Sequence, residues 1–357
     1  MNPSQAPVSV TDLVPSLPRL VAEELLFEAT LKSEPEDFVV EEVPAYEPQG
    51  EGEHLFLWVQ KRDVSPEWLI SQLARHFQVR RDEIGTAGLK DRRAVTRQWV
   101  SIPADAEALV ETFASEEIQI LQSVRHRNKL HTGHLRGNQF EITLRHVPDD
   151  ALQRAEQIIA KLSETGVPNY FGQQRFGIDG ETLELGRNLL RGTASPQDIP
   201  PKRRKFLTRL ALSAAQSSLF NQVLAERMTN GLLHTVQPGD VMQVSASGGL
   251  FVVEDPEREQ ERFDRGETVI TGPIFGPKMK SPTGDPLTRE QAVLEQSGLT
   301  PDVFRTHKKL TPGARRPLLV RPENLTAAAV ENGLRVTMTL PSGVYATVVL
   351  REFLKNA

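Results

Sequence analysis

The chain of 357 residues contains no cysteine. This absence excludes disulfide bonds, thiolate catalysis and zinc or iron–sulfur sites that use cysteine ligands. Long apolar runs are also missing, since no segment approaches the ~18 apolar residues of a membrane-spanning helix, which argues against membrane insertion. The first 20 residues hold four prolines but neither a basic start nor an apolar core. They therefore do not form a signal peptide and predict a loose cytoplasmic leader.

An overall excess of positive charge is missing as well, because 42 lysines and arginines face 47 aspartates and glutamates, for a net charge of -5. The chain is therefore not a basic coat for nucleic acid. Local basic stretches are nevertheless present around Asp91 and, without any acid, at 123–136 and 201–209. They predict either one phosphate-binding surface or three solvated faces, and charge alone leaves both open. The stretch at 123–136 also holds three histidines, for which a phosphate-facing role is favoured over a metal site: His126, His131 and His134.

The length allows two domains, each large enough for its own core. In the first third, apolar alternation predicts strands at 29–40 and 55–59, and helical spacing predicts helices at 66–77 and 104–113. Turn residues crowd the segment from Gly166, the region after it is mainly helical, and strand-like alternation returns past Pro312. We therefore expect an α+β chain in which a first domain (1–165 and 313–357) is interrupted by an insert (166–312).

Asp91 lies among basic residues, namely Lys90, Arg92, Arg93 and Arg97. Neighbouring cations favour the charged form of a carboxylate, so Asp91 is expected to be ionised and suited to act as a nucleophile, base or electrostatic stabiliser. Gly88 predicts a tight turn that would place Asp91 at the rim of a loop. An arbitrary Lys-Asp-Arg triplet is more often a salt-bridged surface turn, and these residues alone leave that alternative open.

Three further groups accompany Asp91: Lys32 with Pro35-Glu36-Asp37-Phe38, then Gly137-Asn138-Gln139-Phe140, and then the run from Asn169 to Gly177. Alone, each has an ordinary structural explanation, such as a surface lysine, a turn asparagine or a core phenylalanine. Together with Gly88-Leu89-Lys90-Asp91-Arg92 they resemble the tRNA pseudouridine synthase D family, and the resemblance extends from about Lys32 to the C-terminus.

The resemblance implies an α+β fold in which a pseudouridine-synthase-type catalytic domain, with a mixed and mainly antiparallel sheet flanked by helices, is interrupted by an inserted α+β TRUD domain. It also implies an isomerase that converts uridine in tRNA to pseudouridine, usually uridine 13 of the D arm. The implied partner is tRNA, and no cofactor, metal, membrane or obligate protein partner is implied. A cytoplasmic location is expected.

For the site, the resemblance implies that Asp91 is the essential carboxylate and that Lys32 keeps it ionised and oriented. Phe140 would stack on the uracil, a contact worth about 1–3 kcal/mol per base, and Asn138 would hydrogen-bond nearby. The expected RNA-binding residues are cations of the basic stretches and of the run after Asn169: Lys90, Arg92, Arg125, Arg127, Lys129, Arg136, Arg175, Lys202, Arg203, Arg204 and Lys205.

Two other functions remain open from the residues. One is a noncatalytic RNA-binding module that uses the same basic stretches. The other is an aspartate-dependent hydrolase of nucleotides or phosphate esters, supported by the spacing of Gly85, Gly88 and Lys90. That spacing lacks the Gly-Lys-Ser/Thr end of a P-loop.

Overall fold

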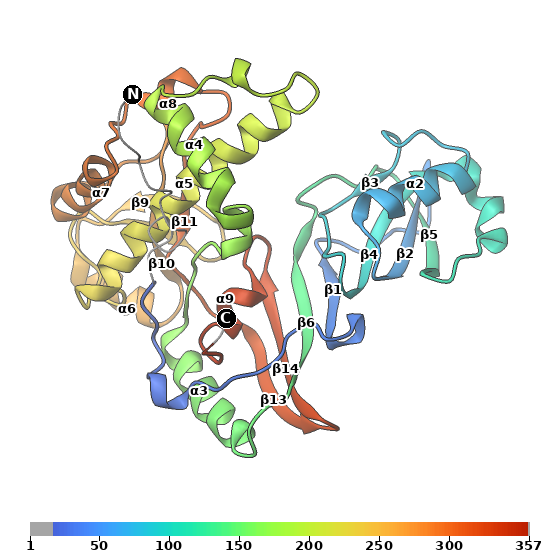
Figure 1. Ribbon diagram of the computed structural model, residues 1–357, viewed down its shortest axis with the longest axis horizontal. Helices are drawn as coiled ribbons and strands as arrows, with labels where there is room; N and C mark the ends of the chain where they lie inside the picture. Colours follow the sequence, from blue (N-terminus) through green and yellow to red (C-terminus); the bar gives the residue numbers. More distant parts are fainter. Residues whose placement is uncertain (1–16, 356–357) are drawn as a thin grey trace, which may run out of the picture. The chain divides into compact units, whose positions relative to one another are not determined.

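A computed structural model describes residues 17–355, which form two compact units (Figure 1). The sheet unit comprises residues 21–164 and 321–355, and the middle unit comprises residues 17–20 and 165–320. The loose leader expected over the first 20 residues lies mostly outside the described residues.

The sequence predicts a return to the first domain at residue 313, whereas residues 313–320 belong to the middle unit. The reason is strand pairing. Strand β11 (Ala314–Pro317) pairs antiparallel with β10 (Thr268–Ile274), and β12 (Leu319–Val320) pairs with β7 (Val167–Pro168). The alternation past Pro312 therefore does form strands, but the first two of them, β11 and β12, pair with strands of the middle unit.

The sheet unit is built on a mixed eight-stranded sheet, which confirms the expected α+β class. Its only parallel pair among the described strands is β1 with β4, and the other pairs are antiparallel. Figure 1 shows the β13–β14 hairpin (red) beside β6 (green) at one side of this sheet. In order across the sheet the strands are β13 (Glu323–Val330), β14 (Gly333–Pro341), β6 (Leu135–Arg145), β1 (Phe38–Pro44), β4 (Val95–Pro103), β2 (His54–Arg62) and β5 (Ile118–His126), with β3 (Gly85–Thr86) paired to β4.

Helix α2 (Pro66–His76) confirms the helix expected at 66–77. Ser65 caps it, because its Oγ accepts a hydrogen bond from the Trp68 N–H at 3.2 Å, and Pro66 fits the first helical position, where no N–H partner is needed. Leu69 and Leu73 are almost fully buried against the inward residues of β2 and β4. Helix α2 therefore covers one face of the sheet at β2 and β4. Burial of each such leucine is worth about 1.5–3 kcal/mol.

The strand expected at 29–40 begins only at Phe38. Pro35 opens a short 3₁₀ turn (Pro35–Asp37), and the Asp37 carboxylate closes it by accepting from the Glu34 N–H at 3.1 Å. The helix expected at 104–113 is a 3₁₀ helix, η3 (Ala104–Thr112). The remaining helical elements of the sheet unit are η1 (Glu23–Leu25), α3 (Ala151–Thr165) and α9 (Ala346–Leu350).

The middle unit contains a four-stranded sheet in the order β11-β10-β8-β9 and a helical layer in which α4 packs along α5. Figure 1 shows the long helix α5 beside α4. Its other elements are η4 (Gln173–Arg175), η5 (Ile178–Gly180), α4 (Glu181–Arg191), η6 (Pro196–Asp198), α5 (Arg204–Thr229), β8 (Val241–Val244), β9 (Leu250–Val252), α6 (Pro256–Asp264), α7 (Gly284–Gln296) and α8 (Val303–Thr306).

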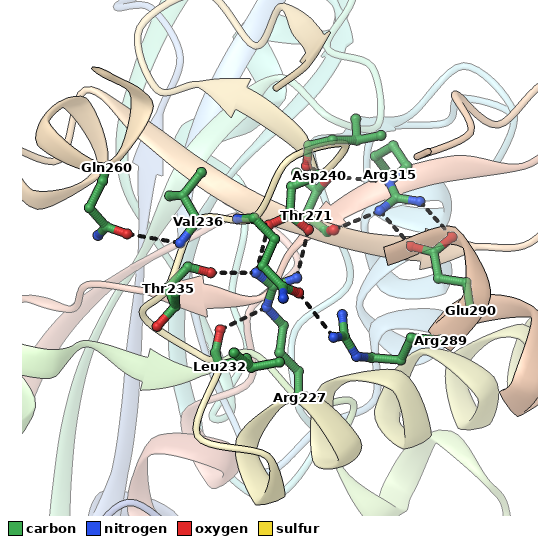
Figure 2. A network of polar contacts seen from close by, with 12 residues as sticks. Arg227, Leu232, Thr235, Val236, Asp240, Gln260, Thr271, Arg289, Glu290 and Arg315 are labelled. Atoms are coloured by element: carbon green, nitrogen blue, oxygen red, sulfur yellow. Dashed lines mark hydrogen bonds and ion pairs between the residues drawn. The ribbon is translucent and has the colours of Figure 1, made fainter. Parts of the chain in front are cut away.

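Two buried arginine–carboxylate pairs tie the middle unit together, and Figure 2 shows them side by side. Arg227 on α5 holds Asp240 with two bonds of 2.6 and 2.7 Å. Arg315 on β11 holds Glu290 on α7 at 2.8 and 3.0 Å, and it donates to the Thr271 carbonyl at 2.6 Å. Removing one member of such a buried pair typically costs about 3–5 kcal/mol. The last segment of the middle unit is therefore held in two ways, by the pairing of β11 with β10 and by the contacts of the Arg315 side chain.

No helix within residues 17–355 combines the length and the apolar character needed to cross a bilayer.

Candidate active site

Asp91 lies in the loop between β3 and β4, with its side chain 54% exposed. Lys32 Nζ donates to Asp91 Oδ2 at 2.8 Å and lies 3.8 Å from the centroid of the Phe38 ring. Lys32 itself adopts a left-handed backbone conformation, with φ 56°, which is uncommon for a residue with a side chain. The structure thus brings together Lys32 and Asp91, two residues distant in sequence that were both expected at the site.

Lys61 is a site residue that the sequence analysis missed. Its side chain is fully buried, and its Nζ donates to the main-chain carbonyl of Asp91 at 2.6 Å and to that of Val64 at 2.9 Å. Burial lowers the pKa of Lys61 from 10.5 to about 8, against the opposing pull of the Asp91 and Asp63 carboxylates. A signal was present, since Lys61 continues the inward alternation of Leu57 and Val59 on β2. Lysine is rarely fully buried unless it is paired, so a lysine at a core position of a strand indicates a buried polar contact.

Lys90 was expected to bind RNA, and this is wrong for the described structure. The residue is only 6% exposed, and its Nζ donates to Glu42 Oε2 at 2.8 Å. Glu42 is also buried, accepts from the Trp99 N–H at 3.3 Å, and has its pKa raised by burial despite the Lys90 ammonium. A buried ammonium with a buried partner has no free face for a phosphate, so Lys90 anchors the loop instead.

Of the four cations around Asp91 in the sequence, Lys90, Arg93 and Arg97 contact other groups. Arg93 Nη2 donates to the Ser33 carbonyl at 2.9 Å, and Arg97 pairs with Glu41 at 2.9 Å. Arg92 is exposed beside Asp91. The local cation that contacts the Asp91 carboxylate is Lys32, from outside the basic stretch.

Phe140 and Asn138 lie on β6, on the sheet face that also carries Lys61. The pairs Phe140–Val40, Val40–Thr96 and Thr96–Lys61 are directly opposite across β6, β1, β4 and β2, and opposed residues place their side chains on one face. Phe140 is 7% exposed and meets Phe38 edge to face, with ring centroids 6.1 Å apart.

Two buried polar atoms on this face have no hydrogen-bond partner among the described residues. They are Asn138 Oδ1 and Thr96 Oγ1. Buried polar groups are nearly always paired in folded proteins, so each unpaired atom requires an explanation. A bound ligand with polar edges would supply it.

The expected basic residues of the sheet unit are partly neutralised. Arg125 pairs with Glu107, Arg127 pairs with Glu51, and Lys129 donates to the Asp82 carbonyl. The two arginine pairs are 45–65% exposed, and pairs of this kind are worth only about 0–1 kcal/mol. A phosphate can therefore replace the carboxylate at low cost. Arg136 is exposed at the start of β6.

The phosphate-facing role expected for the histidines is wrong for His126. It is buried, stacks on Tyr46 with ring centroids 5.1 Å apart, and has its pKa lowered by burial. His134 Nδ1 is hydrogen-bonded to the Tyr46 hydroxyl at 2.8 Å. These side chains belong to a small aromatic cluster. The described residues contain no group of three or more His, Asp or Glu side chains placed to hold a metal ion.

In the middle unit, the run from Asn169 is mostly structural. Asn169 is buried and donates to the Pro317 carbonyl at 2.9 Å, and the buried Tyr170 donates its hydroxyl to Met228 Sδ at 3.1 Å. Arg175 donates to Ser213 and Ser217 on α5. This run therefore fastens the first loop of the unit to α5 and β11.

The basic segment 202–205 lies at the start of α5. Lys202, Arg203 and Lys205 are exposed, whereas Arg204 donates to the carbonyls of Gln197 and Ile199, both at 3.3 Å. The first turn of α5 contains no acid. Cations at a helix N-terminus oppose the helix dipole, so this placement is locally unfavourable and is relieved by an anion.

Comparison with known proteins covers nearly the whole chain. The family model of tRNA pseudouridine synthase D matches residues 19–196 and 202–353. A tRNA pseudouridine synthase D from Anaeromyxobacter sp. (strain Fw109-5) is 43% identical over 326 residues, which cover 91% of this chain and 92% of the relative. One from Thermus thermophilus is 42% identical over 331 residues, covering 91% and 88%. A crystal structure of a tRNA pseudouridine synthase D candidate from Methanosarcina mazei is 24% identical, with a TM-score of 0.77 over 96% of each chain, and shares the fold.

Proposed function

This chain belongs to the tRNA pseudouridine synthase D family and is an isomerase of uridine in tRNA, and on that premise we propose that it acts on uridine 13 of the D arm with Asp91 as its catalytic residue. The observation that carries the assignment is the state of Asp91. Its main chain is held by the buried Lys61 and its carboxylate is bonded to Lys32, yet more than half of the side chain faces solvent. A carboxylate that is rigidly held, charge-paired and open to a ligand is suited to catalysis.

The reaction rearranges the substrate without net gain or loss of atoms. The bond between N1 of uracil and C1′ of the ribose breaks, the ring turns, and C5 bonds to C1′. The proton on C5 leaves and N1 gains one. The Asp91 carboxylate supplies negative charge at the sugar–base junction during this exchange, and Lys32 orients it by a charge-assisted hydrogen bond.

The detached uracil must be held while it turns. We assign stacking on the uracil to Phe140, a contact worth about 1–3 kcal/mol per base. The unpaired Asn138 Oδ1 and Thr96 Oγ1 lie on the same sheet face and offer hydrogen bonds to the polar edge of the ring. Binding of the base would thereby satisfy two buried atoms.

We assign catalysis to the sheet unit and additional tRNA contact to the middle unit. Most of the middle unit lies in sequence between the two parts of the sheet unit. Arg92 and Arg136 are the exposed cations of the sheet unit closest in sequence to Asp91 and Asn138. In the middle unit, Lys202, Arg203 and Lys205 present positive charge at the start of α5. We also propose a cytoplasmic location, because a tRNA-modifying enzyme works where tRNA is processed.

The central test is release of tritium from C5 of labelled uridine in a tRNA transcript, followed by mapping of the modified position. Wild-type protein is expected to release tritium from position 13, and Asp91→Ala is expected to release none. Asp82→Ala is the matched control, because Asp82 is also an exposed carboxylate paired with a cation, Arg80. Full release by Asp91→Ala would refute the assignment of Asp91, and release from another position would refute that of uridine 13.

The tRNA contact of the middle unit has a separate test. Neutralising Lys202, Arg203 and Lys205 to alanine is expected to weaken tRNA binding and to reduce the slope of log affinity against log salt by roughly 1 for each phosphate that the variant no longer neutralises. Arg204 is left in place because it holds the preceding turn. Arg258→Ala with Arg265→Ala on and just after α6 is the control, and an unchanged slope in the first variant would remove this segment from the binding surface.

A further inference from the structure

Leu89 lies two residues before Asp91 with 76% of its surface exposed. Only four large apolar residues in the described part of the chain are exposed: Leu89, Leu121, Ile178 and Phe206. Single exposed leucines are common, so exposure alone carries nothing. The position of this one does, because its loop is the one that carries Asp91.

The loop around Leu89 is anchored on both sides. Before Leu89, the Ala87 carbonyl accepts from the Gly133 N–H at 2.8 Å. After it, Lys90 is locked onto the buried Glu42, and the Asp91 carbonyl is held by Lys61. These contacts hold the residues on either side of Leu89, so its backbone loses little conformational entropy if the exposed side chain becomes buried on binding.

Two residues of extended chain span at most about 7 Å. Leu89 therefore stays within a nucleotide's length of Asp91. On the proposed function, a uridine whose sugar–base junction reaches Asp91 leaves its place in the helical stack, and that vacated place would lie next to the loop. Proteins that unstack nucleic acids commonly fill such gaps with leucine or another apolar wedge, and removing a base from a stack costs a few kcal/mol that the wedge offsets.

We propose that Leu89 is a positioning residue that enters the space vacated by the target uridine and holds the flipped state of the RNA. This inference rests on the proposed function of the site. Leu89 touches the neighbouring bases rather than the reacting atoms. Its contribution therefore depends on how firmly the uridine is paired and stacked before binding.

The test compares Leu89→Ala with wild type on two transcripts, one unaltered and one in which the nucleotide opposite the target uridine is changed so that it no longer pairs. On the unaltered transcript, Leu89→Ala is expected to lower kcat/KM about 10- to 100-fold, from the few kcal/mol of a lost wedge. On the unpaired transcript the loss is expected to shrink below about threefold, since little unstacking then remains to be offset. Leu89→Met is expected to restore activity, and Leu121→Ala, an exposed leucine of the same unit, to leave it unchanged.

A second readout uses 2-aminopurine beside the target position, whose fluorescence rises when its neighbour leaves the stack. In an Asp91→Asn background, which prevents turnover, adding Leu89→Ala is expected to remove more than half of this rise at saturating protein. Equal losses on both transcripts, or no loss on either, would overturn the proposal. Failure of wild-type protein to modify uridine 13 in the unaltered transcript would instead count against the proposed function.

Discussion

The buried pair of Lys90 and Glu42 allows a quantitative prediction about the loop that carries Asp91. Both side chains are nearly inaccessible, at 4% and 0% exposure. At their separation of 2.8 Å, the Coulomb attraction is about 6 kcal/mol for an effective dielectric constant of about 20. Much of this attraction is offset by the cost of removing two charges from water. The pair as a whole therefore contributes little to the free energy of unfolding, but removing either partner leaves the other charge buried without compensation.

Glu42→Ala leaves the Lys90 ammonium buried without a partner. We expect it to lower the free energy of unfolding of the sheet unit by about 3–5 kcal/mol, measured as the shift of the urea midpoint at constant slope. The double variant Glu42→Leu with Lys90→Met replaces both charges by apolar groups of similar size. It is expected to be within about 1 kcal/mol of wild type or more stable.

A third variant, Lys90→Met alone, separates a structural role of Lys90 from an RNA contact. Lys90→Met should leave the salt slope of tRNA binding unchanged, because a buried ammonium releases no counterion from RNA. A cost below about 1 kcal/mol for Glu42→Ala, or a double variant as unstable as the single one, would refute the reasoning. A reduced salt slope in Lys90→Met would return Lys90 to the RNA-binding residues.

Three further predictions concern other groups. Asp91→Asn should abolish isomerisation while changing the unfolding free energy by less than about 1 kcal/mol, because its pair with Lys32 is partly exposed; tritium release and urea unfolding measure the two. The pKa of Lys61 is lowered from 10.5 to about 8 in the folded chain. Between these two pH values the Lys61 side chain is therefore protonated in the unfolded chain and neutral in the folded chain. Stability should therefore rise between pH 8 and 10.5, by up to about 3 kcal/mol, and Lys61→Met should remove this rise in urea midpoints taken across that range. Arg227→Met should destabilise the middle unit by about 3–5 kcal/mol, since it leaves Asp240 buried and unpaired, and thermal unfolding followed by calorimetry measures it.

Local signals in the sequence were sufficient where the structure depends on nearby residues. Helix α2 was predictable because Ser65, Pro66 and the apolar spacing all act within one helix. Strand β13 was not, because its sequence, Glu-Asn-Leu-Thr-Ala-Ala-Ala-Val, lies at the edge of the sheet with no residue fully buried and shows no apolar alternation. Helix α6 was missed for a similar reason, since it is highly charged and buries only Glu259 and Phe263.

The candidate site divides in the same way. Asp91 was identifiable from its sequence neighbours, but its actual contacts come from Lys32 and Lys61, which are distant along the chain. Lys90 was assigned to the surface because its charge is visible in the sequence and its buried partner Glu42 is not. Burial is a property of the tertiary fold, so the sequence could name the charged residues but not which of them face solvent.

The chain order of the sheet has a consequence for synthesis in the cell. Strand β6, which carries Asn138 and Phe140, pairs with β14 from Gly137 to Arg145, and the two strands are separated in sequence by residues 146–332. During translation, one edge of β6 therefore has no partner while residues 165–320 of the middle unit emerge from the ribosome. An open strand edge is prone to pair with other chains, and this edge of β6 is covered only when β14 follows the middle unit out of the ribosome.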